Sequence, residues 1–377
     1  MTHWTHNLDP IALSLGSLQI RWYGVMYLVG YITGYFLLKQ RWKRGMFALN
    51  PEEIQVLITY LMIGMMLGAR LLYMFVYHEH RDEVISGTFG FLAIWEGISI
   101  KGLAIGAAAA ILVPNYLLPI LGIAGEVRKT PAEWNFKKYW YWYVIATLAI
   151  ARIFFIRDNQ AHEYEYFLEI PAIWTGGLSY HGAAIGFVIA SMMIGKKFGL
   201  SFFHIMDNVV FGAALGVFFG RMGNFINGEL PGRTTDVAWG IIFPGYGTEP
   251  RHPSQLYQGF GEGLTVLLIL FLLEKFLQKK GQAPQCVYSK TGEKNEKPVL
   301  VHWPRVGILC TSYLILYGVA RFVVEFFRQP DAQLGFYFGF LSMGQILCFL
   351  MILAGAILLS IRIKNPTQEE YKVTPFP

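Results

Sequence analysis

The sequence is poor in charged residues and in cysteine, and it lacks the short motifs of nucleotide and zinc sites. Only 15% of its 377 residues are Asp, Glu, Lys or Arg. Its 3 cysteines form no CxxC pair and have no companion histidines, which argues against a disulfide framework and a cysteine zinc site. No P-loop motif, HExxH motif or acidic DxxD-type cluster occurs, so we expect neither a bound nucleotide nor a metal ion.

Charge is scarce because apolar runs take up much of the chain, which is 54% hydrophobic. An apolar run of about 20 residues can cross a bilayer as a helix. We therefore predict an all-α fold, a polytopic transmembrane helical bundle that forms a single membrane domain over residues 1–377. The first residues, MTHWTHNLDP, lack a basic start and an apolar core, so no cleaved signal peptide is expected. About nine membrane segments are expected, near residues 20–38, 54–77, 98–120, 140–157, 178–196, 204–220, 256–277, 306–324 and 343–363.

Lysine and arginine gather in every other predicted loop, beginning with residues 39–44 after the first segment. The alternate loops, such as 78–83 and 157–169, are acidic or mixed. Because cytoplasmic loops are enriched in Lys and Arg, we expect the N-terminus outside and the C-terminus in the cytoplasm. The net charge of +6 is thus distributed as in a membrane protein, and no nucleic acid partner is expected. Residues 281–299 are predicted to form a mobile cytoplasmic loop.

One polar stretch, Gly220 to Arg233, interrupts the apolar runs and reads GRMGNFINGELPGR. It follows the apolar segment near 204–220, so its charged and amide side chains lie where lipid should begin. A charged side chain at membrane depth costs about 3 kcal/mol, so such residues indicate a functional site. An interfacial loop with snorkelling arginines is the alternative, but snorkelling does not call for the asparagines and glycines. The predicted orientation places this stretch toward the outer face.

Five segments of the chain, in order, resemble the motifs of bacterial prolipoprotein diacylglyceryl transferases. They are RWYG at 21–24, GGLSYHG at 176–182, GRMGNFINGELPGR at 220–233, RHPSQLY at 251–257 and RFVVEFFRQPD at 321–331. The resemblance implies transfer of the diacylglyceryl group of phosphatidylglycerol to the lipobox cysteine thiol of exported prolipoproteins, the first step of lipoprotein maturation. It also implies a multi-pass protein of the bacterial cytoplasmic (inner) membrane, with its active site toward the outer face. The implied partners are phosphatidylglycerol, prolipoproteins and the lipid bilayer, and no cofactor is expected.

The implied reaction needs an anion clamp, help in deprotonating a thiol, and room for two acyl chains. Arg221 and Arg321 match family motifs and suit the clamp, because the planar guanidinium pairs with phosphate and stays charged at low dielectric. A salt bridge is the alternative role, since Glu325 lies one helical turn after Arg321. His181 is the candidate base because imidazole titrates near neutrality, although a buried core histidine is the alternative. Glu229 and Glu325 are expected to orient an arginine, accept a proton or hold the headgroup.

A second set of motif residues is expected to bind substrate. Asn224 can bond a phosphate or a headgroup hydroxyl, and Gly232 permits a turn closed to other residues. Tyr23 stands at the outer edge of the first segment, where membership of an aromatic belt is the alternative. The predicted substrate-binding residues are Tyr23, Arg221, Asn224, Gly232, Arg233, Arg251, His252 and Gln255.

The chain also contains an internal repeat, with copies about eighty residues apart. GARLLYMFVY and LAIWEGISIKGLAIG, at 68–77 and 92–106, recur as IARIFFIRDN and PAIWTGGLSYHGAAIG, at 150–159 and 171–186. The aligned pairs include Arg70 with Arg152, Trp95 with Trp174, Lys101 with His181 and Gly102 with Gly182. Residues 54–138 are therefore predicted to duplicate the 139–196 region, which would extend the seven spans of the family to nine. Chance similarity between apolar segments is the alternative.

Only the second copy carries the GGLSYHG form, with Gly176 and Gly177 side by side. Lysine is normally protonated at neutral pH, so Lys101 would be a poor base in the place of His181. We therefore predict that only the second copy is catalytic and that the first serves as scaffold or lipid-facing packing. The sequence leaves open whether Arg70 or Arg152 corresponds to the arginine on the second span of the family.

Two other classes of membrane protein share some of these features. A transporter or channel also shows intramembrane arginines and repeats, but here the repeat is local and the polar residues gather toward one face. A different phospholipid-modifying enzyme would differ in its acceptor. The membrane-embedded lipid transferase accounts for more of the motifs than either alternative.

Overall fold

The computed structural model describes residues 3–15, 18–92, 99–114, 136–156, 169–172, 177–281, 285–286, 299–303, 305–329, 336–337, 341–366 and 369–373. The chain divides into two compact units. Met1–Leu61 and Ala190–Pro377 form the first, here called the signature unit because it contains Gly220 to Arg233. Met62–Ile189 forms the second, here called the repeat unit. Trp95, Trp174 and Gly176 of the predicted repeat lie outside the described residues.

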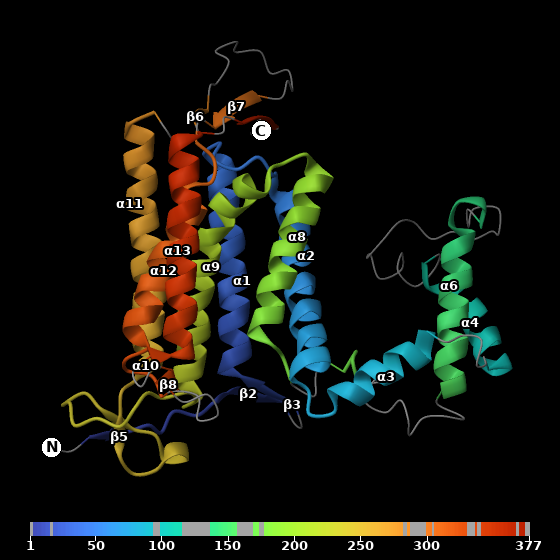
Figure 1. Ribbon diagram of the computed structural model, residues 1–377, viewed down its shortest axis with the longest axis horizontal. Helices are drawn as coiled ribbons and strands as arrows, with labels where there is room; N and C mark the ends of the chain where they lie inside the picture. Colours follow the sequence, from blue (N-terminus) through green and yellow to red (C-terminus); the bar gives the residue numbers. More distant parts are fainter. Residues whose placement is uncertain are drawn as a thin grey trace. The chain divides into compact units, whose positions relative to one another are not determined.

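The signature unit is built mainly of helices (Figure 1). Local capping residues fix where two of them begin. The Ser201 side chain accepts a hydrogen bond from the His204 amide at the start of α9, and Ser342 and Gln345 form a capping box at the start of α13. The elements are α1 (Trp22–Lys43), the first part of α2 (Pro51–Leu72), the end of α8 (Tyr180–Phe198), α9 (Phe202–Ile226), α10 (Ser254–Gln258), the π-helical turn η8 (Gly259–Thr265), α11 (Val266–Lys279), α12 (Ile308–Val324) and α13 (Met343–Lys364).

The repeat unit contains the remainder of α2 and the beginning of α8. Between them lie η1 (Tyr73–Tyr77), α3 (Arg81–Leu92), α4 (Ile100–Leu112) and α6 (Phe136–Phe155). In Figure 1, α4 packs along α6, and α8 lies beside α2.

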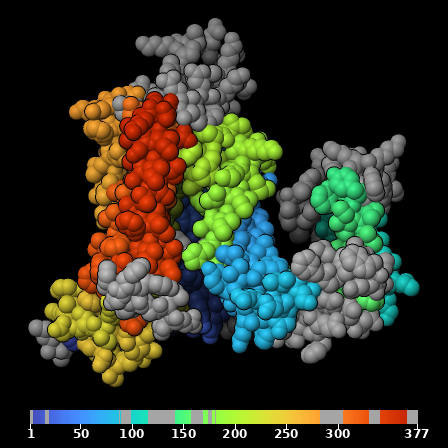
Figure 2. Space-filling model, viewed as in Figure 1, coloured from blue at the N-terminus to red at the C-terminus, as the bar shows by residue number. Residues whose placement is uncertain are grey.

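Helices occur at each of the nine predicted segments within the described part of the chain. Three stretches, Pro51–Tyr77, Phe202–Ile226 and Met343–Lys364, are long and apolar enough to cross a membrane. The apolar surface of α13 supports this, since Phe349, Leu350 and Leu353 are exposed along it and the helix forms one outer face of its unit (Figure 2). Such a surface is typical of lipid contact rather than of a water-soluble protein. The number of spans and their orientation stay predictions.

The fold is mostly helical, as predicted, and the connecting segments in the described part of the chain also pair in four small sheets. Buried backbone groups in loops need partners, and short strands supply them. One sheet joins β1 (Trp4–Thr5), β4 (Ile241–Ile242) and β5 (Pro250–Arg251), and another joins β6 (Gln285–Cys286), β7 (Val299–Trp303) and β10 (Glu369–Val373). Two hairpin pairs are β2 (Ile11–Leu15) with β3 (Leu18–Arg21), and β8 (Phe336–Tyr337) with β9 (Leu341–Ser342).

The predicted mobile loop, 281–299, falls partly on the second of these sheets. Gln285 and Cys286 pair with His302 and Val301 of β7, which itself begins at Val299. The residues between Cys286 and Val299 lie outside the described residues.

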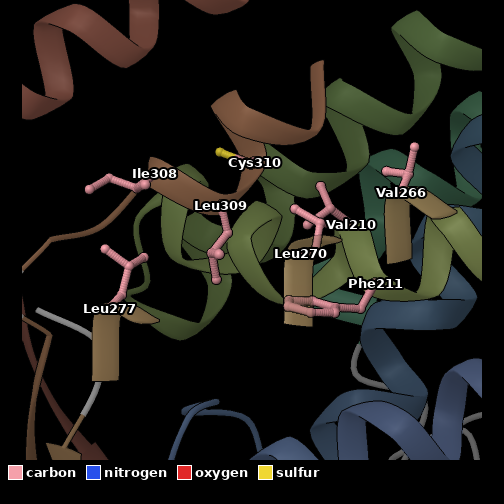
Figure 3. Packing of buried hydrophobic residues seen from close by; sticks show 8 residues of the cluster. All are labelled: Val210, Phe211, Val266, Leu270, Leu277, Ile308, Leu309 and Cys310. Atoms are coloured by element: carbon pink, nitrogen blue, oxygen red, sulfur yellow. The ribbon is translucent and has the colours of Figure 1, made fainter. Parts of the chain in front are cut away.

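The core of the signature unit lies between α9, α11 and α12. Figure 3 shows its eight buried side chains: Val210, Phe211, Val266, Leu270, Leu277, Ile308, Leu309 and Cys310. Beside them, Arg41 of α1 makes a buried two-pronged ion pair with Glu274 of α11, at 2.7 and 3.0 Å. Asp207 of α9 accepts hydrogen bonds from the amides of Gly307 and Cys310, which fixes the start of α12. Packing and these polar contacts together hold the helices that carry the polar stretch.

Candidate functional site

The Gly220–Arg233 stretch forms the last turn of α9 and the tight loop after it. Asn227 caps the helix, and Gly228 turns the chain with φ of +68°, a conformation that favours glycine. The turn brings Glu229 back to the helix, where it accepts hydrogen bonds from the amides of Asn224 at 3.3 Å and Asn227 at 3.2 Å. Arg221 donates to the Asn224 side-chain oxygen at 3.4 Å. Three of the predicted residues therefore form one chain, Arg221–Asn224–Glu229.

The N-terminal segment closes over this turn from the other side. His6, which follows β1, is within hydrogen-bond distance of the Phe225 carbonyl, at 2.7 Å from its Nε2. A side chain at position 228 would meet the His6 ring, so glycine is required there by contact as well as by φ. Sequence reasoning did not nominate His6, because its partner lies more than two hundred residues away.

Gln255 and Ser254, at the start of α10, hold the backbone of the same turn. The Gln255 side chain donates to the Glu229 carbonyl at 2.6 Å, and the Ser254 hydroxyl donates to the Leu230 carbonyl at 3.2 Å. Both side chains are fully buried. Leu230 has a positive φ of 54°, which is strained for a residue with a side chain. The RHPSQLY motif therefore supports the polar stretch by fixing its backbone.

Gly232 and Arg233 form a β-like junction with His252 and with the end of the α12 segment. The Gly232 and His252 amides donate to the His252 and Arg233 carbonyls, at 2.8 and 3.0 Å, and the Arg233 amide donates to the Phe327 carbonyl at 3.0 Å. A side chain at position 232 would overlap the Phe327 carbonyl, so the junction closes only around glycine. Arg233 Nε donates to the Arg328 carbonyl at 2.7 Å. These contacts account for Gly232 and Arg233 without any bound substrate.

Arg251 also contributes to this junction. Its Nη1 donates to the Gly232 carbonyl at 3.2 Å, and its guanidinium lies 5.9 Å from the centre of the Tyr246 ring. The contacts of Arg251 are therefore structural in this conformation.

His252 and its aromatic neighbours form a polar chain beside the junction. Trp239 donates to the Tyr257 hydroxyl at 2.7 Å, and that hydroxyl lies 3.3 Å from His252 Nδ1. Burial lowers the pKa of His252 below its ordinary value, against the opposing effect of the Asp236 carboxylate. A neutral ring can accept the Tyr257 proton, so the chain has a consistent donor order from Trp239 to His252.

Arg321 and Glu325 lie in a buried ion cluster at the end of α12. Arg321 pairs with Glu325 at 2.8 Å and lies 3.6 Å from Glu262, which is fully buried on η8. Arg328 donates to the same Glu325 oxygen at 3.1 Å, and the Ser342 hydroxyl donates to the other oxygen at 3.1 Å. The salt-bridge alternative for Arg321 is therefore part of its role.

Arg221 belongs to the edge of this cluster. Its Cβ packs near Gly259 of η8, and its charge acts on Glu262 together with those of Arg321 and Arg328. Arg321 Nη1 is buried and has no hydrogen-bond partner among the described residues. Three guanidinium groups around two buried carboxylates leave donor capacity for an anion, which is the chemistry of a phosphate clamp.

Tyr23 lies at the start of α1, where α1 meets α9. Its ring approaches Gly223, because a side chain at position 223 would lie 3.0 Å from the ring. Its hydroxyl and that of Tyr27 are 2.8 Å apart. Tyr23 is half-buried beside the polar stretch, and its charge environment includes Glu229 and Arg221.

His181 lies in the repeat unit, at the first turn of α8. Ser179 caps this helix by accepting from the Gly182 amide at 3.3 Å. His181 is exposed, with its Nδ1 3.3 Å from the Tyr77 hydroxyl. The core-histidine alternative is therefore wrong.

The structure brings the predicted residues of the signature unit together and adds others that sequence reasoning missed. Glu262 had one available signal, a carboxylate within the apolar segment 256–277, and Arg328 lies within the RFVVEFFRQPD motif, whereas Ser342 had no signal in the sequence. Within the described part of the chain, no group of three or more His, Cys, Asp or Glu side chains gathers as a metal ion would require.

Comparison with known proteins gives one consistent result. The family model described as prolipoprotein diacylglyceryl transferase matches residues 10–125 and 116–361. A phosphatidylglycerol–prolipoprotein diacylglyceryl transferase of Oleidesulfovibrio alaskensis is 32% identical over 365 residues, covering 97% of each chain. Proteins of the same name from Geobacter sulfurreducens and Aeromonas hydrophila are 31% and 33% identical, covering 96% and 95% of this chain and 98% and 92% of their own. The resemblance found in the motifs is confirmed, and these matches do not favour the transporter.

Proposed function

Because the chain belongs to the prolipoprotein diacylglyceryl transferase family, we propose that it transfers the diacylglyceryl group of phosphatidylglycerol to the lipobox cysteine of exported prolipoproteins. The cysteine sulfur forms a bond to the glyceryl carbon that carries the phosphate, and the bond from that carbon to the phosphate oxygen breaks. The leaving group is glycerol phosphate, which keeps the electron pair, and the thiol proton passes to a base. No oxidant, reductant or nucleotide is needed for this balance.

The observation that carries the proposal is the ion cluster around Arg321. Its buried Nη1 has no hydrogen-bond partner among the described residues, while Nη2 is held by Glu325 at 2.8 Å. A guanidinium that is held by Glu325, lies 3.6 Å from Glu262 and still has an unbonded donor is suited to bind the phosphodiester. As the carbon–oxygen bond breaks, negative charge grows on the leaving phosphate, so donors aimed there stabilise the transition state.

The Arg221–Asn224–Glu229 chain provides the second half of the clamp. Arg221 adds a second guanidinium, and Asn224 orients it through the 3.4 Å contact while being held itself by Glu229. We assign phosphate binding to Arg221 and Arg321 and orientation to Asn224, Glu229 and Glu325. Tyr23, beside Gly223, and Asn227, bonded to Glu229, are assigned to a headgroup hydroxyl.

His181 is proposed as the base that takes the thiol proton. It is exposed and held at a helix start, so a peptide thiol can approach its ring. Imidazole is the side chain best matched to proton transfer at neutral pH. The Tyr77 hydroxyl lies 3.3 Å from His181 Nδ1 and holds the orientation of the ring that would take the thiol proton.

The proposed setting is the bacterial inner membrane, with the polar stretch toward the outer face. The alternation of basic loops supports this orientation, since it assigns the loop after α9 to the outside. Exported prolipoproteins present their lipobox on that side, so acceptor and site would meet there.

The experiment that tests the proposal follows the leaving group. Phosphatidylglycerol labelled in its headgroup glycerol is incubated in vesicles with purified protein and a lipobox peptide. Release of labelled glycerol phosphate is expected with the cysteine peptide and not with its Cys→Ser version, and EDTA should not prevent it. Release that is independent of the peptide would indicate a lipase and contradict the proposal.

A further inference from the structure

Two helix pairs in the repeat unit share one arrangement, in which a serine-capped helix docks on a helix that carries a buried arginine. At the start of α8, the Ser179 amide donates to the Ala69 carbonyl of α2 at 3.0 Å. At the start of α4, the Ser99 amide donates to the Ala151 carbonyl of α6 at 3.1 Å. Both serines also cap their own helices, with side-chain oxygens that accept from Gly182 and Gly102.

The glycines of the two pairs are used in the same way. A side chain at Gly182 would overlap the Gly68 carbonyl, and one at Gly186 would overlap that of Gly64. In the other pair, a side chain at Gly102 would lie 2.7 Å from Ala151 Cα, and one at Gly106 would lie 2.7 Å from the Thr147 carbonyl. Both pairs therefore depend on backbone approach through glycines four residues apart.

These contacts cross the repeat. Ser99 aligns with Ser179, and Ala69 aligns with Ala151, so each serine binds the alanine of the other copy. α8, from the second copy, docks on α2 of the first, and α4, from the first copy, docks on α6 of the second. The segment between Tyr77 and Gln160 thus contains a self-contained pair, α4 with α6. The two stretches matched by the family model meet inside this segment, at 116–125.

Arg70, in the first copy, binds backbone carbonyls of the second copy that precede His181 in the sequence. Its side chain is 3% exposed and donates to three carbonyls, those of Glu169 at 2.8 Å, Ile170 at 3.2 Å and Gly177 at 3.3 Å. Because the planar guanidinium has donors in fixed directions, one arginine can hold residues 169–170 and residue 177 at the same time.

Two tyrosines of the first copy complete the contacts. Gly177 has φ of +66°, and a side chain there would overlap the Tyr73 ring. The Tyr77 hydroxyl lies 3.3 Å from His181 Nδ1. These contacts to residues 177–181 are all made by residues of the first copy, although residues 177–181 belong to the second copy.

We propose that the histidine site is assembled across the repeat, with Arg70 as its positioning residue, and that residues 78–159 form an insert that transfer does not require. This rests on the proposed function and deepens it. It also extends the expectation that the first copy serves as scaffold or lipid-facing packing, because its first helix holds residues 177–181 while its second helix belongs to the insert. The family arginine left open by the sequence is accordingly Arg70.

Arg152 offers a matched control, since it occupies the same repeat position and is 1% exposed, with its guanidinium 5.1 Å from the centre of the Phe155 ring. Arg70→Lys should lower kcat about tenfold or more, the effect of losing a charge-assisted hydrogen bond, with little change in KM for phosphatidylglycerol. Arg152→Lys should stay within about threefold of wild type, by the same scale. Equal losses in both variants would overturn the proposal.

A pH series separates positioning from general stability. If Arg70 acts through His181, the deficit of Arg70→Lys should shrink as pH rises from about 7 to about 9, where the peptide thiol ionises without help. A merely destabilised protein would show no such recovery. A deficit that is constant across the series would contradict the assignment.

Excision tests the insert directly. Deleting residues 78–159 joins Tyr77 to Gln160 in the same repeat register, and the shortened protein should retain transfer within about threefold of the full chain. A shortened protein that purifies as a single species and shows no transfer, alongside an active full chain, would sink the proposal.

Cross-linking in the full chain decides the pairing even if the shortened chain does not fold. Cysteines at Ala69 and Ser179 should form a disulfide on oxidation, because their backbones share a hydrogen bond, and cysteines at Ala69 and Ser99 should not. The reverse pattern would refute the crossed pairing. Absence of transfer by the wild-type chain would count against the proposed function and leave this cross-linking result unaffected.

Discussion

Replacing Glu325 by glutamine tests whether the ion cluster serves catalysis or only the fold. Glu325 is 4% exposed, and its two oxygens accept from Arg321 at 2.8 Å, Arg328 at 3.1 Å and Ser342 at 3.1 Å. Glutamine keeps the shape and one acceptor oxygen, which can still face the arginines while its NH₂ group donates to Ser342, but it removes the negative charge. Both guanidinium groups then lose the charge of their shared partner.

The expected loss of unfolding free energy depends on which partners the two arginines keep in the variant. Removing one partner of a buried ion pair costs about 3–5 kcal/mol. Here Arg321 still has Glu262 at 3.6 Å, and the Arg328 side chain is 19% exposed and can reach water. We therefore expect a loss of about 2–3 kcal/mol in unfolding free energy. If Arg321, released from Glu325, moves closer to Glu262, its unbonded Nη1 becomes committed to that carboxylate instead of the phosphate, and kcat should fall about 100-fold.

The matched control is Glu274→Gln, which breaks the Arg41–Glu274 pair in the same unit. Glu274 is also 4% exposed and also holds an arginine, at 2.7 and 3.0 Å. It lies roughly 18 Å along the helix from Glu262, at 1.5 Å per residue over the intervening turns. The control should lose similar stability but keep kcat within about threefold.

The assay is transfer to a lipobox peptide, measured at a temperature where circular dichroism shows both variants folded. Thermal unfolding in detergent gives the relative stabilities. If Glu325→Gln and Glu274→Gln lose equal stability and both keep kcat, the ion cluster has no catalytic role and the reasoning fails.

Three further predictions concern the clamp, the base and the topology. Arg221→Lys keeps the charge but loses the planar fork, so transfer should fall about tenfold or more; activity within twofold of wild type would make Arg221 structural. His181→Ala should nearly abolish transfer while Lys101→Ala leaves the rate unchanged, as peptide turnover by both variants would show; the opposite outcome would mean that the wrong copy was chosen. A cysteine at Asp236 should react with a membrane-impermeant thiol reagent only from outside, and one at Ser289 only from the cytoplasmic side; labelling of both from one side would disprove the predicted span count.

The local contacts of the polar stretch were accessible from the sequence. One helical turn separates Arg221 from Asn224, and a tight loop brings Glu229 back to them. Their proximity is therefore set by local backbone geometry, which the glycines of the stretch indicate. Helix positions were also predictable, because long apolar runs dominate the chain. The features that the sequence predicted best were therefore the helices and the contacts between residues close together in the chain.

Partners chosen by helix packing could not be predicted in the same way. Glu262 meets Arg321 only because η8 packs against α12, and no spacing in the sequence encodes that contact. The strands escaped prediction because pairs of two residues, such as β1 with β4, take their register from the helices that present them.

The packing of the two repeat copies also could not be predicted from the sequence. The alignment identified Arg70 and Arg152 as equivalents, but the pairing of α8 with α2 depends on which glycines meet. The crossed arrangement could be found only from the contacts.

The measurement that tests the central claim most directly is mass spectrometry of a lipobox peptide after incubation with purified protein and phosphatidylglycerol of defined acyl chains. We predict a mass increase equal to that diacylglyceryl group, located on the cysteine by fragmentation. Its bond to sulfur should survive mild alkali that removes the ester-linked acyl chains, since a thioether resists hydrolysis. An unmodified peptide, or a mass increase of a single acyl group that alkali removes, would contradict the account.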